Sequence, residues 1–334
     1  MPLPEMQEIV SKAVVHPKEE GKTITFAHVE DREEIINSPE VLLFLSAFPL
    51  DLQKACIQCF LEGDINSKKA RKVKDYLLKV SDMAQIIYEE GSDSFKVFEI
   101  LYGLELPTNQ IDHSLVNSLA GLGVRRRLKA FNLQLPGIIR ELHQRFSVPR
   151  IKVENLGSGP GYELLGVLQK DPGFSQWLDV RNVDKDAEAI KVGQQRFDKA
   201  GFQDQDCVKF VCQDFLRIDR RDAHLVICDG IFCGTPYRKL VQFLRIFWHY
   251  LCPDGIIVYS TNQESMVESD PWTDYIMRLS GWPLDYKTDE RSWQAAREAQ
   301  VADKDQMTIR GYKPIRIFYE GPSTFQCMVV AQKE

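Results

Sequence analysis

The sequence predicts an α/β fold, in which a doubly wound, mostly parallel sheet follows a mainly α-helical N-terminal region. From residue 151 onward, short β-branched runs alternate with amphipathic segments, and strands that alternate with helices form parallel sheets covered on both faces. Before residue 151, apolar side chains recur at helical spacing. The length of 334 residues suits about two compact units.

Helix signals recur through the N-terminal region. Ser38-Pro39-Glu40 supplies an N-cap and a proline at the first helical position, and the apolar run that follows ends at Pro49. A second helix is expected from about Asp51. Cys56 and Cys59 fit the apolar face of this second helix, and no other cysteine pair has ligand spacing. We therefore expect both thiols to be buried and predict no metal site.

The strands of the second region are predicted in chain order. They are residues 151–156, 177–183, 208–211, 225–228 and 256–259. Residues 237–251 carry apolar side chains on one helical face, before Pro253-Asp254-Gly255 turns into the next strand. The chain ends on two strand-like runs, 315–319 and 325–331, which predict an antiparallel hairpin.

Composition and charge narrow the class of partner. The chain carries 42 Lys and Arg against 48 Asp and Glu, a net charge of −6, and neither half has an excess of basic residues. Nucleic-acid binding depends on clustered basic side chains, so we expect a small-molecule or protein partner instead. Eight irregularly spaced cysteines, no membrane span and no targeting signal in the opening residues predict a cytoplasmic protein.

A glycine-rich loop, Gly157-Ser158-Gly159-Pro160-Gly161, follows the first strand of the second region and precedes a helix. Glycines at this place let a ligand approach the backbone closely, as dinucleotides and S-adenosylmethionine do. The dinucleotide fingerprint G-x-G-x-x-G would need a glycine where Tyr162 stands. Pro160 also removes a backbone N–H that a pyrophosphate would use. The loop therefore favours a cofactor without phosphates.

Carboxylates end the next three strands. Asp184 follows the second strand, 23 residues after Gly161, where it can accept hydrogen bonds from both ribose hydroxyls of either cofactor class. Asp214 follows the third strand and can accept a hydrogen bond from an adenine amino group, while Phe215 packs on the base. Asp229 ends the fourth strand.

Together these motifs resemble the class I S-adenosylmethionine-dependent methyltransferases over about residues 120–334. The resemblance rests on Val153 to Gly161, Asp184, Gln213-Asp214, Cys228-Asp229-Gly230 and Leu251-Cys252-Pro253-Asp254-Gly255. It implies S-adenosylmethionine as cofactor and a seven-stranded sheet whose reversed seventh strand is the terminal hairpin. Where the family usually has an acid in the first strand motif, this chain has Asn155. The contact to the cofactor's amino group is therefore in question or passes to Glu154.

Candidate site residues follow from position and from the resemblance. The candidate cofactor-binding residues are Glu154, Asn155, Gly157, Gly159, Gly161, Asp184, Asp214, Phe215, Asp229 and Arg126. Arg126 would either pair with the cofactor carboxylate or lie on a solvated helix. Methyl transfer is an in-line displacement that needs positioning, desolvation and sometimes a base. Asp229 and Tyr237 are the catalytic candidates, with packing or turn roles equally open. Methyltransferases that act on a base or amide nitrogen hold the planar nitrogen with an [Asn/Asp]-Pro-Pro-[Tyr/Phe] motif. The segment after the fourth strand lacks this motif, which argues against such acceptors.

The sequence therefore predicts a helical domain over residues 1–120, which selects the acceptor, covers the cofactor or mediates association. Residues 121–334 are predicted to form the domain that binds S-adenosylmethionine and transfers its methyl group. Two alternatives stay open. One is an NAD(P)-dependent Rossmann oxidoreductase, and the other is a non-catalytic module that retains the fold, in keeping with Asn155 and with the lack of an obvious base.

Overall fold

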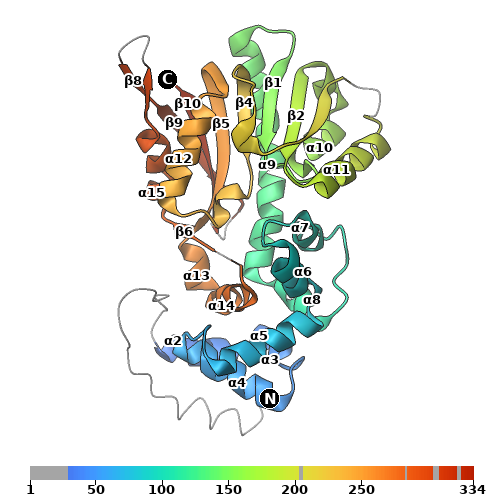
Figure 1. Ribbon diagram of the computed structural model, residues 1–334, viewed down its shortest axis with the longest axis vertical. Coiled ribbons are helices and arrows are strands. Elements are labelled where there is room, and N and C mark those ends of the chain that lie inside the picture. The colour runs from blue at the N-terminus through green and yellow to red at the C-terminus, as the bar shows by residue number, and fades with distance from the viewer. Residues whose placement is uncertain (1–28, 203–205, 283, 304–307, 322–324) are drawn as a thin grey trace. The chain divides into compact units, whose positions relative to one another are not determined.

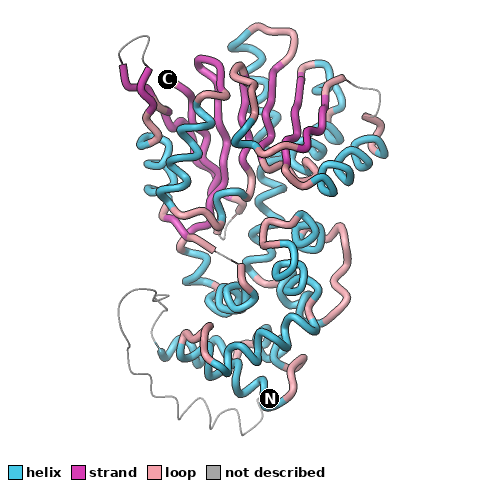
Figure 2. The backbone as a smooth tube through the Cα atoms, viewed as in Figure 1, coloured by secondary structure: helices cyan, strands magenta, loops and turns pink. Residues whose placement is uncertain are grey.

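A computed structural model of the protein describes residues 29–202, 206–282, 284–303, 308–321 and 325–334. Its chain divides into two compact units, one helical and one built on a sheet (Figure 1, Figure 2). Of the described residues, those up to Val124 and those of Ser265–Leu284 form the first unit, and those of Arg125–Glu264 and Asp285–Glu334 form the second. Over the described part of the chain, no helix has the length and apolar character needed to cross a bilayer.

The first unit packs helices on helices. Its described helices are α2 (Val29–Ile36), α3 (Pro39–Leu45), α4 (Leu50–Glu62), α5 (Lys68–Val80), α6 (Asp82–Glu90), α7 (Phe95–Leu101), α8 (Gln110–Asn117), α13 (Ser265–Ser269) and α14 (Pro271–Ser280). The Ser38 hydroxyl accepts from the backbone N–H of Val41, which confirms the predicted N-cap of α3. Cys56 and Cys59 are completely buried in α4, as expected.

The segment Ser265–Leu284 belongs to the first unit, whereas from the sequence it was expected within the domain formed by residues 121–334. Its aromatic side chains explain the difference. The ring of Trp272 lies 5.6 Å from that of Phe44 and 5.0 Å from that of Phe60, centroid to centroid. The Tyr275 hydroxyl donates to the Asp64 carbonyl at 3.2 Å. Burial of large aromatic rings outweighs proximity along the chain in deciding where this segment packs.

The second unit is built on one large sheet. Its strands are β1 (Ile151–Leu156), β2 (Leu178–Asp184), β3 (Val208–Cys212), β4 (Ala223–Cys228), β5 (Leu251–Gln263), β6 (Tyr286–Lys287), β9 (Tyr312–Tyr319) and β10 (Gln326–Lys333). The main order is β3-β2-β1-β4-β5-β10-β9, and the two-residue β6 pairs beside β5. The first five strands are parallel, and β10 runs antiparallel between β5 and β9. The predicted parallel sheet with a terminal antiparallel hairpin is confirmed.

Strand β5 is longer than the predicted 256–259. The residues expected to form a turn, Pro253-Asp254-Gly255, lie inside β5 as a local irregularity, where Asp254 has a φ of 60° and the register against β4 shifts. A short pair of antiparallel strands, β7 (Val301–Asp303) and β8 (Thr308–Arg310), forms a separate small sheet. Between two paired positions β5 advances from Leu251 to Ile256 while β4 advances only from Ala223 to Leu225, so extra residues of β5 accommodate the turn signal without ending the ladder.

Helices cover both faces of the sheet, as Figure 1 shows. One face packs against α9 (Leu119–Phe146), α10 (Tyr162–Lys170) and α11 (Ala187–Lys199). The other face packs against α12 (Tyr237–Trp248) and α15 (Asp289–Glu298). Short 3-10 turns complete the connections: η1 (Pro172–Gln176), η2 (Phe215–Arg217) and η3 (Ile231–Cys233). Both apolar faces of the β-branched strands are thereby buried, which is the reason for their continuous hydrophobic runs.

Gly193 sets the approach of α11 to the glycine loop. A Cβ at this position would lie 2.5 Å from Cε1 of Phe210 and 2.8 Å from the carbonyl oxygen of Pro160. Both distances are shorter than van der Waals contact. The absence of a side chain at residue 193 is therefore what lets α11 pack against β3 and against the loop.

We predict that Gly193→Ala destabilises the protein by about 1–3 kcal/mol through overpacking. The matched control is Gly137→Ala, an exposed glycine within α9 whose added Cβ would meet no atom within 4 Å. That change should be neutral or stabilising by up to about 1 kcal/mol, the ordinary helix preference for alanine. Urea unfolding followed by circular dichroism measures both, and equal effects of the two substitutions would contradict the packing argument.

Candidate functional site

The glycine loop joins β1 to α10. The φ angles of Gly157, Gly159 and Gly161 are 57°, 50° and 77°, in the left-handed region that glycine adopts without steric penalty. A Cβ at residue 157 would lie 2.8 Å from Cδ1 of Ile231, and one at residue 161 would lie 2.9 Å from Oδ1 of Asn182. Backbone conformation and close packing both require glycine here.

The loop lies at the point where the strand order of the sheet reverses. Strand β1 lies between β2 and β4, so the chain moves to one side after β1 and to the other side from β4 onward. In open α/β sheets, ligands bind in the crevice at the carboxyl ends of the strands that flank this point. The residues that follow β1 and β4 therefore define the candidate site.

Asp184, at the end of β2, holds the loop in place. The backbone N–H of Gly159 donates to its Oδ2 at 2.7 Å, and the N–H of Asp186 donates to its Oδ1 at 2.9 Å. Burial raises the pKa of Asp184, an effect that these two hydrogen bonds oppose. A carboxylate offers about four acceptor positions, so this side chain can accept further hydrogen bonds from a ligand.

Phe215 lies beside the loop, and Asp214 caps the turn that carries it. The Phe215 ring meets Phe243 and Phe247 edge-on, and its Cε1 lies 3.9 Å from the position of a Cβ at Gly157. Asp214 accepts from the N–H of Leu216 at 2.9 Å, and its side chain is 44% exposed. The structure therefore brings an aromatic ring to the loop, with a carboxylate next to it in the sequence.

A buried polar cluster lies next to the loop. Nδ2 of Asn155 donates to Oδ1 of Asn182 at 2.9 Å and to Oε2 of Glu163 at 3.4 Å. All three side chains are buried. Burial and the charge of Asp229 together raise the pKa of Glu163 to about 8, against the opposing effects of the charge of Arg127 and the hydrogen bond from Asn155. Glu163 was not among the residues predicted from the sequence, where its only signal is its place in the first turn of α10.

Arg127 and Asp229 form a buried ion pair at the end of β4. Nε of Arg127 lies 2.8 Å from Oδ1 of Asp229, with both side chains 3% exposed, and the Ser260 hydroxyl donates to the same oxygen at 2.8 Å. Nη1 of Arg127 donates to Oε1 of Gln326 at 2.7 Å. The other carboxylate oxygen of Asp229, Oδ2, is buried and has no hydrogen-bond partner among the described residues. Such an atom is costly to leave unsatisfied and therefore points to a ligand.

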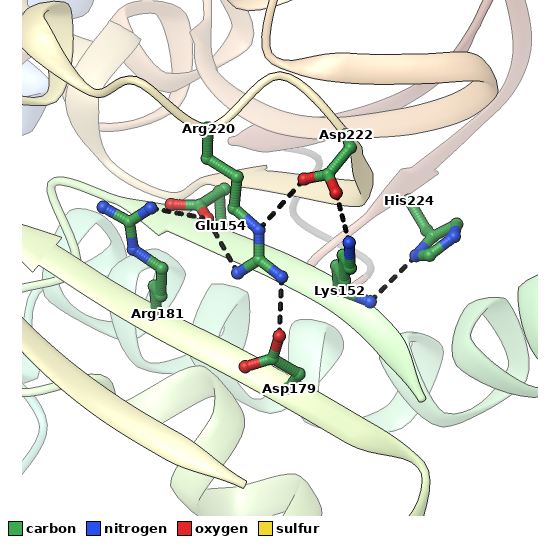
Figure 3. A network of polar contacts seen from close by, with 7 residues as sticks. All are labelled: Lys152, Glu154, Asp179, Arg181, Arg220, Asp222 and His224. Atoms are coloured by element: carbon green, nitrogen blue, oxygen red, sulfur yellow. Dashed lines mark hydrogen bonds and ion pairs between the residues drawn. The ribbon is translucent and has the colours of Figure 1, made fainter. Parts of the chain in front are cut away.

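Glu154 takes part in a different network, which Figure 3 shows. Its Oε1 lies 3.1 Å from Nη1 of Arg220 and 3.6 Å from Nη1 of Arg181, and Arg220 also pairs with Asp179 at 2.6 Å. Lys152, Asp222 and His224 extend this network. Successive strand residues point to opposite faces, so Glu154 and Asn155 cannot share a site on one face. Both residues were candidates for the cofactor's amino group, but the structure does not place Glu154 with the loop cluster.

The remaining two candidates lie elsewhere in the second unit. The Tyr237 ring lies 5.9 Å from the guanidinium of Arg291, and burial together with Glu298 raises the pKa of the Tyr237 hydroxyl to about 12. Cδ of Arg126 lies 3.6 Å from the position of a Cβ at Gly321, just after β9. The structure brings Arg127, and not Arg126, to Asp229.

A sequence signal for Arg127 existed. Along α9, Val124, Phe131 and Leu135 are buried, and Arg127 falls on the same stripe at spacings of three and four residues. Only one of three consecutive arginines can point to such a face, because each helical step rotates the side chain by about 100°. A buried arginine requires a partner, which is found in Asp229.

Comparison with known proteins supports the fold. No protein-family model matches the sequence, and no curated protein matches it either. A possible exported protein from Bordetella parapertussis shares 18% identity over 89% of this chain and 99% of its own, with a TM-score of 0.60. Magnesium protoporphyrin IX methyltransferase from Synechocystis PCC 6803, solved with bound SAH, shares 13% identity over 79% of this chain and 99% of its own, with a TM-score of 0.51. The chain has the fold of class I S-adenosylmethionine-dependent methyltransferases.

We predict that Arg127→Met destabilises the protein by about 3–5 kcal/mol, because it leaves the Asp229 carboxylate buried without its positive partner. The double variant Arg127→Met/Asp229→Asn removes that charge and should recover at least half of the loss. Urea unfolding measures the free energies.

Arg140→Met is the matched control on the same helix. Its ion pair with Asp171 spans 3.6 Å between half-exposed side chains, so its loss should cost at most about 1 kcal/mol. A double variant no more stable than Arg127→Met alone would contradict the proposed charge coupling.

Proposed function

We propose that the second unit binds S-adenosylmethionine and transfers its methyl group to a small-molecule acceptor. The observation that carries this proposal is the glycine loop with three left-handed glycines, locked by Asp184 at the reversal point of a class I methyltransferase sheet. The Synechocystis protein with this fold is named as a methyltransferase of a small molecule and was solved with bound SAH. Together these facts favour S-adenosylmethionine as the cofactor and methyl transfer as the reaction.

The residues around the loop fit the parts of this cofactor. Gly157, Gly159 and Gly161 would face the methionine portion, and Asp184 would accept hydrogen bonds from the ribose hydroxyls. Phe215 would pack on the adenine, with Asp214 accepting from its amino group. The unpartnered buried Oδ2 of Asp229 requires a hydrogen-bond donor, which the amino-acid portion of the cofactor would supply.

The bound cofactor would supply an electrophilic methyl group on a sulfonium leaving group. The chain's own residues then position the acceptor and exclude water. With a pKa of about 12, Tyr237 stays protonated near neutral pH, and its ring lies beside Arg291 of α15, so the proposal assigns it no part in the transfer. Asp229 is held by Arg127 and Ser260, so its proposed part is contact with ligand. A base is not assigned.

A cytoplasmic location is part of the same proposal. All eight cysteines of the chain lie in described residues and are free thiols. Reduced cysteines are the ordinary state in the cytosol. A protein could accept the methyl group instead of a small molecule. The following experiment distinguishes these two kinds of acceptor.

The test has two steps. Calorimetric titrations with S-adenosylmethionine and with NAD(H) and NADP(H) measure which cofactor binds; exclusive dinucleotide binding would overturn the proposal in favour of an oxidoreductase. Methyl-labelled S-adenosylmethionine is then incubated with the protein and with either the low-molecular-mass or the protein fraction of a cell extract. Label is expected in the low-molecular-mass products. Binding without labelled product in either fraction would instead support a non-catalytic module.

We predict that Asp184→Ala weakens S-adenosylmethionine binding at least tenfold, which corresponds to about 1.4 kcal/mol. The control is Asp186→Ala, two residues further on, which removes the cap of α11. It should lower stability by about 1 kcal/mol and leave the Kd unchanged. Calorimetric Kd values decide, and equal Kd values for Asp184→Ala and the wild type would refute the ribose assignment.

A further inference from the structure

The ion pair of Arg127 with Asp229 lies close enough to Glu163 for both charges to act on it, so we treat these three buried side chains as one cluster. Glu163 is 6% exposed, Arg127 2%, and the side chain of Asp229 3%. If both acids were ionised, the cluster would carry a net charge of −1 away from water, which is costly without a further cation. The raised pKa of Glu163 means that the free protein avoids this cost by keeping a proton there near neutral pH.

The groups that act on Glu163 come from several elements. Asp229, after β4, raises its pKa, Arg127 of α9 lowers it, and Asn155 of β1 donates a hydrogen bond to it. Arg127 pairs with Asp229 and donates to Gln326 and to the Cys233 sulfur. Its charge acts on Glu163 as well, so one guanidinium serves two carboxyl groups in this cluster. Oδ2 of Asp229 is the atom that lacks a partner among the described residues.

We propose that this cluster is a one-cation site, in which Oδ2 of Asp229 binds the α-ammonium group of the cofactor and the bound charge displaces a proton from Glu163 to solvent. The inference rests on the proposed function. In this exchange the Glu163 carboxylic acid loses one proton and becomes a carboxylate. The ammonium group keeps its own protons, and no covalent bond of the cofactor changes.

This assignment gives Asn155 a role. An acid at residue 155, usual for the resembled family, would add a third carboxyl group to a cluster that already holds two carboxyl groups against one guanidinium. The amide of Asn155 instead donates to Glu163, and a hydrogen bond to a carboxylate favours its ionised form. Asn155 is thus a positioning residue, and Glu163 supplies the charge from the first turn of α10.

The proton count on binding tests the inference. Calorimetric titration with S-adenosylmethionine at pH 7, in buffers of different ionisation enthalpy, is expected to show the release of nearly one proton per cofactor. Between pH 6 and 7 the affinity should then rise about tenfold, because each released proton adds one unit to the slope of log K against pH. Over this range the cofactor's α-amino group, with a pKa of roughly 7.7–8.0, remains mainly charged.

Glu163→Gln is the decisive variant. It removes the proton but keeps an oxygen for Asn155, so we expect binding with close to zero proton release and about the same affinity at pH 6 and 7. Glu188→Gln is the control, since Glu188 occupies the first turn of α11 but is exposed. It should behave like the wild type.

Three outcomes overturn the inference. Equal proton release by the wild type and Glu163→Gln would refute it while leaving the proposed function intact. Failure of the wild type to bind S-adenosylmethionine at all would refute both. A wild-type comparison serves if Glu163→Gln does not fold: S-adenosylhomocysteine should release the proton, whereas 5′-methylthioadenosine, which lacks the amino-acid portion, should not. Equal release by these two ligands would also refute the ammonium assignment.

Discussion

The buried ion pair between Arg127 and Asp229 fixes the point at which α9, β4 and β10 meet. Removing two charges from water is favourable only when further hydrogen bonds satisfy them, and Ser260 and Gln326 provide these bonds. A helix that precedes the sheet in the chain is thereby tied to the end of a central strand. The end of β4, one of the two strands that flank the reversal point, is thereby held in a defined geometry, which is the condition for positioning a ligand precisely.

The polar side chains on the two faces of β1 serve different purposes. Those on one face join a network of ion pairs, and those on the other face lie next to the glycine loop. Glu154 points to the face covered by the connection from β3 to β4, residues 213–222, where only the short η2 forms and the ion pairs of Arg220 cover the strands (Figure 3). Asn155 points to the opposite face and joins the cluster next to the glycine loop. A strand alternates its side chains, so adjacent polar residues can serve unrelated purposes.

Local patterns predicted most of the fold, because strands and helices here follow their periodicity. The alternation of strands and helices from residue 151 predicted the parallel sheet. The Ser38 cap predicted the start of α3, and the terminal strand-like runs predicted the antiparallel hairpin. Contacts between residues far apart in the chain could not be predicted from local patterns. The packing of Trp272 on Phe44 assigns its segment to the first unit, and no local signal encodes that contact. Within the site, the glycine loop was recognisable from spacing. Glu163 was not, since its meaning depends on a neighbour at the end of another strand.

The charge balance at the loop also bears on which cofactor the site favours. A dinucleotide would bring a pyrophosphate, with two negative charges, to the helix that follows the glycines. Next to this loop, however, lie two buried acids against a single guanidinium, and Pro160 removes one of the N–H donors that phosphates use. The α-ammonium group of S-adenosylmethionine can balance the second acid when that acid ionises, whereas a phosphate would bring further negative charge next to two acids. Electrostatics therefore favours S-adenosylmethionine over NAD(P) independently of the spacing of the glycines.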